Sequence, residues 1–404
     1  YKGSTPLAIA RGNKKWEWLG WWPTINAFII LAYYSMILSW ALKYLTLSFT
    51  KGWGNDTNSY FYKDFLQSSS SAFEFGYIIW PILIGIAILW AVNWFICYKG
   101  VKGGIEKLNK VLLPLLIGIM LIIVIRGVTL EGAFIGLNKL FTPDWSKMAE
   151  PKVWIAAYGQ VFFSLSVGMG IMMTFSSYLP EKSDINNSAF MTAFANCGFE
   201  FLCAIGVFGI LGFMAVSQGV PFEEVVSGGI GLAFIVFPKV FSVMGVWGTI
   251  LGVLFFTCLV FAGLTSSVSL VEAVSSAFID KTGWERKKVV SLICGLGFVV
   301  SIAFATRAGL YLLDIIDNFV NNYGIVVIGL LEAFVIGWII KPETIRNHTN
   351  EVSYYKIGKW WDITIKYITP AILAIMLISS LINEIKSPYG GYQMAELLTY
   401  GWGI

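Results

Sequence analysis

Residues 159–176 read GQVFFSLSVGMGIMMTFS, an apolar stretch interrupted near its middle by two serines and two glycines. Both residue types weaken a helix, because glycine adds backbone freedom and serine competes for backbone hydrogen bonds. Inside a membrane, non-helical backbone is tolerated only where protein or a water-filled cavity satisfies its polar groups. We therefore predict a membrane-spanning helix that is broken near residues 164–170, beside a cavity.

The composition around this stretch is that of an integral membrane protein. Of the 404 residues, 57% are hydrophobic and only 13% are charged, which is too apolar for a soluble core with a charged surface. Most apolar runs have about 20 residues or more, a length that suits helices crossing a ~30 Å hydrocarbon layer rather than barrel strands. The sequence predicts an all-α, polytopic helix bundle in a single domain, residues 1–404. The nine expected spans are 19–47, 76–98, 111–126, 153–179, 189–216, 242–279, 288–305, 310–339 and 360–383.

The connecting segments predict an orientation. Lysine and arginine are enriched in alternate segments, beginning with the one before the first span. Because positive charge favours the cytoplasmic side of the cell membrane, we expect the N-terminus inside and the C-terminus outside. Two long segments are then extracellular. Residues 48–75 are polar and expected to be mobile, whereas 217–241 contain an apolar piece too short to cross, expected to pack on the bundle like a lid.

Several function classes lack the residues that they require. The five cysteines lie in apolar runs without metal-ligand spacing, and His348 is the only histidine. Neither a disulfide framework, a zinc site nor a nucleophile–histidine pair is indicated. The net charge of +4 is weak and not gathered on one face, which gives no support for nucleic-acid binding. We expect that the protein is not an enzyme.

Polar side chains inside the predicted spans form five groups. Serine and threonine commonly bond back to a carbonyl one turn earlier, so each group alone has a purely structural explanation. A charge at mid-bilayer costs roughly 2.5–3.5 kcal/mol and persists mainly beside a cavity or a partner. The carboxylates of Glu200 and Glu272 are therefore stronger candidates for a functional role than the serines. A structural ion pair remains the alternative explanation for them. The five groups are Ser164 and Ser166; Asn196 and Glu200; Thr265, Ser266 and Ser267; Tyr33 and Tyr34; and Asp314 and Asp317.

The groups share one kind of chemistry. Hydroxyls, an amide and freed backbone carbonyls are oxygen ligands, which suit a hard monovalent cation and suit zinc or copper poorly. A helix broken at residues 164–170 would expose such carbonyls, and the start of its second half would offer unpaired amides that attract a carboxylate. One break could thus hold a cation and an anionic substrate together.

Three long motifs carry a resemblance to a known family. They are LFTPDWSKMAEPKVWIAAYGQVFFSLSVGMGIMMTFSSYL at 140–179, FAGLTSSVSLVEA at 261–273 and LLDIIDNFVNNYGIVVIGLLEAF at 312–334. Together they resemble the neurotransmitter:sodium symporter family, in particular its bacterial sodium-dependent amino-acid transporters, over almost the whole chain. The resemblance implies the inverted-repeat, leucine-transporter-like fold. The match begins at the family's first cytoplasmic loop, so the nine spans correspond to its third to eleventh helices, and we expect the first two to be missing.

The resemblance also implies roles for individual residues. Tyr34 matches the tyrosine that binds the substrate carboxylate, and Phe163 matches the aromatic lid over the substrate. Asp317 matches an outer-gate aspartate, while Tyr178 and Asp280 match parts of the inner gate. The implied substrate site comprises Ile30, Tyr34, Phe163, Ser164, Ser166, Met169, Ser266 and Leu270. The implied sodium ligands are Ser164 and Asn196 at one site, and Ala262, Thr265 and Ser266 at a second.

The expected function is sodium-coupled symport of a hydrophobic or aromatic amino acid across the lipid bilayer by alternating access. Met169 stands where the family often has an aromatic residue, and its flexible thioether favours a large hydrophobic or aromatic substrate. Glu200 stands where chloride-dependent members have a serine, so we expect chloride-independent transport, with Glu200 protonated on the return step. An inactive, truncated remnant acting as a membrane scaffold, and less readily a channel, are the alternatives. A homodimer is left open.

Overall fold

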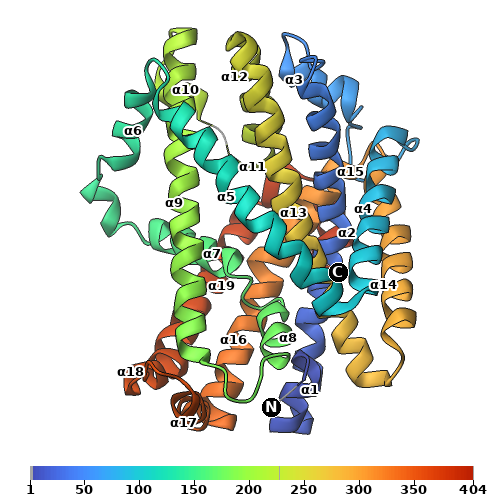
Figure 1. Cartoon of the computed structure of the whole chain (residues 1–404), viewed down its shortest axis with the longest axis vertical. Helices are drawn as coiled ribbons and strands as arrows, with labels where there is room; N and C mark the ends of the chain where they lie inside the picture. Colours follow the sequence, from blue (N-terminus) through green and yellow to red (C-terminus); the bar gives the residue numbers. More distant parts are fainter. Residues whose placement is uncertain (1–2, 227, 404) are drawn as a thin grey trace.

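The computed structural model describes residues 3–226 and 228–403. Its architecture is an all-α bundle, and the only extended pairing in the described residues is an isolated bridge between Ile78 and Thr306. Figure 1 shows long helices running roughly along the vertical axis, with the N-terminal helix α1 (Thr5–Gly12) at the lower end. The predicted fold class is confirmed.

Eight helical runs in the described chain are long and apolar enough to cross a membrane. They agree with eight of the nine predicted spans, although the run expected at 111–126 begins earlier, in a π-helical turn at Val101–Ile105. The remaining span, 153–179, is the broken one. The core helices of the eight runs are α2 (Glu17–Ser48), α4 (Trp80–Tyr98), α5 (Glu106–Val128), α9 (Ile185–Gln218), α13 (Gly245–Thr282), α14 (Arg286–Ser301), α15 (Gly309–Phe319) continuing through π turns into α16 (Val326–Phe334), and α18 (Lys359–Ile363) continuing into α19 (Thr369–Lys386).

The break divides the span into α7 (Pro151–Ser164) and α8 (Ile171–Ser177). Three residues between them have left-handed backbone, with φ of 54° at Ser166, 75° at Gly168 and 70° at Gly170. Glycine adopts this conformation freely, whereas serine does so at a cost. Gly168 and Gly170 therefore supply two of the three left-handed positions that separate α7 from α8.

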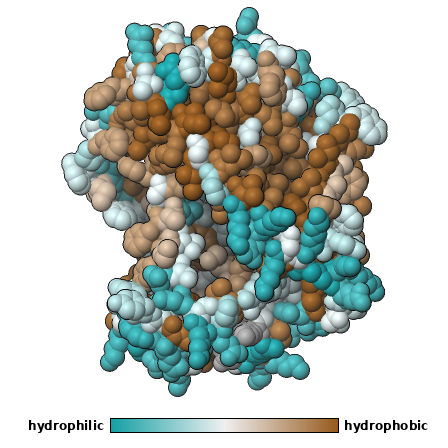
Figure 2. Space-filling view, in the orientation of Figure 1, coloured by the Kyte–Doolittle hydropathy of each residue, from teal (hydrophilic) through white to brown (hydrophobic). Residues whose placement is uncertain are grey.

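The centre of the bundle is the pairing of α2 with α13. At Gly263 of α13, a Cβ atom would lie 1.9 Å from the side chain of Leu38 in α2, so any larger residue there would force Leu38 to shift. Small residues at such crossings let membrane helices pack closely. The outer surface is apolar where lipid would contact it, and Figure 2 shows hydrophobic residues gathered across one face, with polar residues concentrated at the lower end and where α5 begins.

Two connecting segments pack on the upper end of the bundle. The 217–241 segment folds into α10 (Phe222–Val225), α11 (Gly229–Gly231), a π turn at Leu232–Val236 and α12 (Phe237–Val243). Phe234 is buried and stacks on Phe61 with ring centroids 5.7 Å apart. Phe61 belongs to residues 48–75, which the sequence predicts to be mobile. Residues 57–65 form a short helical segment in which Phe61 and Phe65 are buried in this cluster and Tyr62 is exposed, and the mobility of residues 48–75 stays a prediction.

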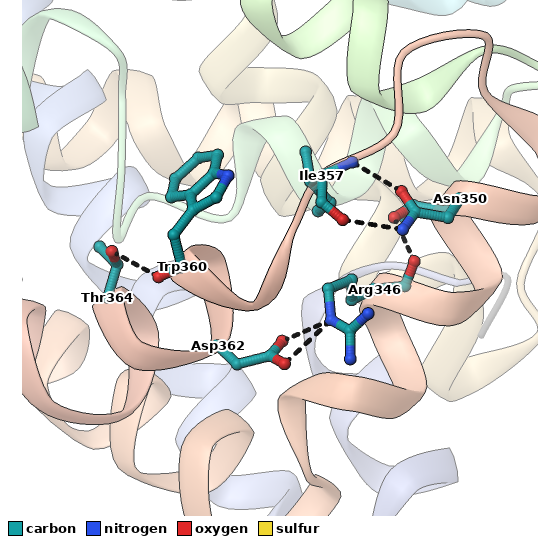
Figure 3. A network of polar contacts seen from close by, with 7 residues as sticks. Arg346, Asn350, Ile357, Trp360, Asp362 and Thr364 are labelled. Carbon is teal, nitrogen blue, oxygen red and sulfur yellow. Dashed lines mark hydrogen bonds and ion pairs between the residues drawn. The ribbon is translucent and has the colours of Figure 1, made fainter.

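The opposite end of the bundle is held by polar contacts between α17 (Pro342–Val352) and the residues after it. The Arg346 Nε donates to both carboxylate oxygens of Asp362 at 3.0 and 2.9 Å, and Asn350 exchanges two hydrogen bonds with the backbone of Ile357 (Figure 3). Asn186, at the start of α9, donates to Asn350 at 3.0 Å. These bonds join α9 to the connection between α16 and α19.

Candidate substrate and ion site at the helix break

A cavity of about 530 Å³ lies beside the break. Its walls come from α2, the start of α5, the broken segment and its flanks, α13 and α15, so residues far apart in the sequence meet there. This volume is within the ~300–1,000 Å³ that is usual for small-molecule sites. The lining residues are Ile30, Tyr33, Tyr34, Ile37, Asn109, Leu113, Phe163, Ser164, Ser166, Met169, Ile171, Thr265, Ser266, Ser269, Leu270 and Asp317.

All eight residues of the predicted substrate site line this cavity. The cavity also includes Thr265 and Asp317, which the sequence reasoning placed at a sodium site and a gate, and six residues that it assigned to no site. Helical spacing could have found several of them, because Ile37 follows Ile30 by two turns, and Ser269 follows Thr265 and Ser266 by about one turn. Leu113 and Asn109 carried no signal, since nothing in the sequence indicates that α5 approaches the break. The six added residues are Tyr33, Ile37, Asn109, Leu113, Ile171 and Ser269.

The predicted ligands of the first sodium site are brought together across two helices. The Asn196 amide nitrogen on α9 lies 3.1 Å from the Ser164 hydroxyl, at the end of α7. The same nitrogen donates to a carboxylate oxygen of Glu200 at 3.0 Å, one helical turn further along α9. The amide oxygen of Asn196 therefore remains available to another partner. The Glu200 carboxylate is hydrogen-bonded to the same side chain.

The predicted ligands of the second sodium site lie on a single turn of α13. The hydroxyls of Thr265 and Ser266 both donate to the carbonyl of Ala262, at 2.8 and 3.2 Å. Such bonds are the common structural role of these residues in membrane helices, but here the same turn faces the cavity. The Tyr34 hydroxyl, across the cavity on α2, interacts with Ser266. Hydroxyl and carbonyl oxygens thus converge where α2 and α13 face the break.

One end of the cavity is bounded by a contact between α2 and α15. The Tyr33 hydroxyl donates to the Asp317 carboxylate at 2.7 Å, and Asn321 donates to the same oxygen at 2.8 Å. The sequence singled out Tyr33 and Asp317 separately, but did not pair them. The geometry makes the tyrosine the partner that ties this carboxylate across the cavity.

Neither of the two predicted inner-gate residues lines this cavity, and they have separate partners. Tyr178 donates to Glu272 of α13 at 2.6 Å, whereas Asp280 accepts a bond from the backbone amide of Ser4 at 2.7 Å. Glu272 is fully buried and pairs with Arg286, whose Nη1 lies 2.9 Å from it. The ion pair left open in the sequence is therefore present for Glu272.

These observations define a class of protein. A helical bundle with one broken span, and with polar side chains and backbone converging at the break, is the architecture of secondary transporters. The chain belongs to the sodium:neurotransmitter symporter family, whose model matches residues 53–404.

Individual relatives agree with this assignment. An uncharacterized sodium-dependent transporter of Methanocaldococcus jannaschii is 40% identical over 397 residues, which are 98% of this chain and 81% of that protein. The sodium- and chloride-dependent taurine transporter of the dog is 28% identical over 89% of this chain, and the sodium-dependent dopamine transporter of Caenorhabditis elegans is 27% identical over 93%. The chain spans 59% and 69% of the lengths of these two animal proteins. The family and the apolar helices indicate a multi-pass membrane protein, and the family implies sodium as the co-transported ion.

Proposed function

We propose that the protein carries a hydrophobic or aromatic amino acid across the cell membrane together with sodium, without a requirement for chloride. The observation that carries this proposal is the cavity at the break, which is lined by all eight residues that the resemblance implies for the substrate site. The domain would correspond to the family's third to eleventh helices, with residues 48–75 and 217–241 on the outside. Lipid and the amino acid are then its partners.

The cavity has one polar wall and one apolar wall, and together they indicate the class of substrate. One side of the cavity presents hydroxyls, including Tyr34 and Ser266, which can bind a carboxylate. The other is apolar and includes Ile30, Met169 and Leu270, each only 4% exposed. Relatives named for taurine and dopamine indicate a small organic substrate that carries an amine. An amino acid with a large apolar side chain satisfies both walls.

The oxygen atoms available as cation ligands support sodium coupling. A cation bound between the Ser164 hydroxyl and the Asn196 amide oxygen would join α7 to α9, and one at the turn containing Ala262 and Thr265 would act on α13. Each cation would therefore favour the helix arrangement in which its ligands lie close together. If the substrate binds the same arrangement, sodium binding and substrate binding strengthen each other.

Chloride independence is argued from Glu200. Its carboxylate is hydrogen-bonded to Asn196 at 3.0 Å, so a fixed negative charge stands next to the proposed sodium ligands. A fixed charge balances a bound cation as a chloride ion would. The name of the archaeal relative mentions sodium alone, whereas that of the taurine transporter mentions both ions.

The test is uptake by the full protein in proteoliposomes with an imposed sodium gradient. We expect labelled leucine or tryptophan to accumulate only with sodium outside, and to do so equally well when gluconate replaces chloride. Glu200→Ser should make uptake depend on chloride. Uptake that favours glycine or charged amino acids would refute the substrate class, and conductance without accumulation would indicate a channel.

A further inference from the structure

Residues 389–402 follow the last membrane-length helix and contact α15 at two places. The Asp314 carboxylate on α15 accepts hydrogen bonds from the hydroxyls of Tyr389 at 3.0 Å and Tyr392 at 2.7 Å, one to each oxygen. Hydrogen bonds to an ionised carboxylate are stronger than neutral ones. This segment therefore holds α15 at its first turns.

The same segment contacts α15 a second time, at the C-terminal end of that helix. Trp402 packs edge-on against Phe319 with ring centroids 5.0 Å apart, and against Tyr323 at 4.8 Å. Gly401 lies so close that a Cβ atom there would be 2.5 Å from the Phe319 ring. Aromatic pairs in this geometry contribute about 0.5–1.5 kcal/mol beyond burial. The second contact is thus apolar. On α15 it begins at Phe319, five residues after Asp314.

A third set of bonds anchors the segment to the bundle. Glu396, in α20 (Met394–Tyr400), is only 3% exposed and accepts bonds from the Ser71 hydroxyl at 2.6 Å and the Ala72 amide at 2.7 Å. The loop that contains these residues is in turn bonded to the backbone of Arg307, just before α15, through Ser69. The segment is therefore fixed to the same end of the bundle as the start of α15.

Asp317, which lines the cavity and is bonded to Tyr33, lies between these two contacts on α15. From these contacts we infer that residues 389–402 are a positioning element for the Tyr33–Asp317 contact. They keep α15 at the distance from α2 at which the hydroxyl reaches the carboxylate, and so keep this end of the cavity closed. The inference rests on the proposed function only in taking this end as the outer one.

The test measures access to the cavity from outside the cell. Ile37, which lines the cavity, is replaced by cysteine in the full protein after the five native cysteines are changed to alanine. Labelling by a membrane-impermeant thiol reagent is then timed in intact cells. Asn58→Cys, at an exposed position in the short helix α3 (Thr57–Ser59), reports which side this end faces. Tyr33→Phe serves as the positive control, because it removes the closing bond directly.

We expect the double substitution Tyr389→Phe and Tyr392→Phe to speed labelling of the cavity cysteine about tenfold, which corresponds to loss of ~1.4 kcal/mol of closure. Trp402→Ala should act in the same direction. Tyr62→Phe, a matched loss of a hydroxyl at the same end, should have no effect. Unchanged labelling in the tyrosine pair and in Trp402→Ala, with faster labelling in Tyr33→Phe, would overturn the inference. Sodium-driven uptake is measured separately, so faster labelling without any uptake would support the positioning role and refute the transport proposal.

Discussion

The Tyr178 hydroxyl lies 2.6 Å from the Glu272 carboxylate and donates a hydrogen bond to it. This bond ties the end of α8, beyond the helix break, to the C-terminal third of α13. Because Glu272 also pairs with Arg286 at the start of α14, three elements meet at one buried charge. The resemblance assigned Tyr178 to the inner gate but named no partner for it.

Removing the positive partner of this charge should destabilise the protein severely. Arg286→Met leaves the Glu272 carboxylate buried and unpaired, which typically costs about 3–5 kcal/mol. We expect a large fall in the thermal unfolding temperature of the detergent-solubilised protein. Adding Glu272→Gln to Arg286→Met should recover much of the loss, and Tyr178→Phe should cost only about 1 kcal/mol. If Arg286→Met alone unfolded like the unmodified protein, the ion pair would have no stabilising role.

Asn196 should determine the sodium dependence of substrate binding. Asn196→Ala removes an amide oxygen available to a cation and the bond that fixes Ser164, so the half-saturating sodium concentration should rise about tenfold or more. The measurement is substrate binding to purified protein across a sodium titration. Asn187→Ala, an exposed asparagine on the first turn of the same helix, is the control and should leave the titration unchanged. An equal shift in both variants would contradict a ligand role.

Ser166 should tolerate glycine but not a β-branched residue. Its φ of 54° is left-handed, a conformation that costs non-glycine residues about 1–3 kcal/mol. Ser166→Gly should therefore unfold at the same or a higher temperature, whereas Ser166→Val should lower the unfolding temperature and weaken substrate binding. Thermal unfolding and binding of the two variants are compared side by side. Equal behaviour of glycine and valine would mean that the break does not depend on this backbone conformation.

Glu396 should make stability depend on pH in the acid range. Burial opposes its ionisation, but the hydrogen bonds from Ser71, Ala72 and Gln393 prevail and lower the pKa of the carboxyl. A lowered folded-state pKa means that the stabilisation is present above the unfolded pKa, about 4.3, and is lost as pH falls through the folded value. Unfolding temperatures measured from pH 7 to pH 3 should fall less steeply in Glu396→Gln. Glu131→Gln, an exposed carboxyl, should keep the full slope, and identical slopes in all three proteins would disprove the assignment.

Features with a local signal were predictable from the sequence. The break at 164–170 follows from serines and glycines in one apolar run, and the spans follow from hydropathy and length. The polar groups that face the cavity were visible because polar residues are rare at that depth. The roles given to single residues, such as Tyr34 toward a carboxylate, came from the resemblance and stay predictions.

Features that depend on distant pairs were not predictable. Tyr33 and Asp317 are separated by 284 residues, and neither periodicity nor composition relates them. Residues 57–65 look polar, yet Phe61 is buried because another loop supplies Phe234. The partner of a buried group is set by how helices cross, which a single sequence does not record.

The continuity of α13 has a mechanical consequence. Thr265 and Glu272 lie on one unbroken helix, seven residues and thus about 10 Å apart along its axis. An α-helix does not readily change its length between two such points, so any axial shift that disturbs the oxygen ligands near Thr265 displaces the carboxylate bonded to Tyr178 by the same amount. The helix therefore transmits position, without an intermediate, from the cavity wall at Thr265 to the contact between Glu272 and Tyr178.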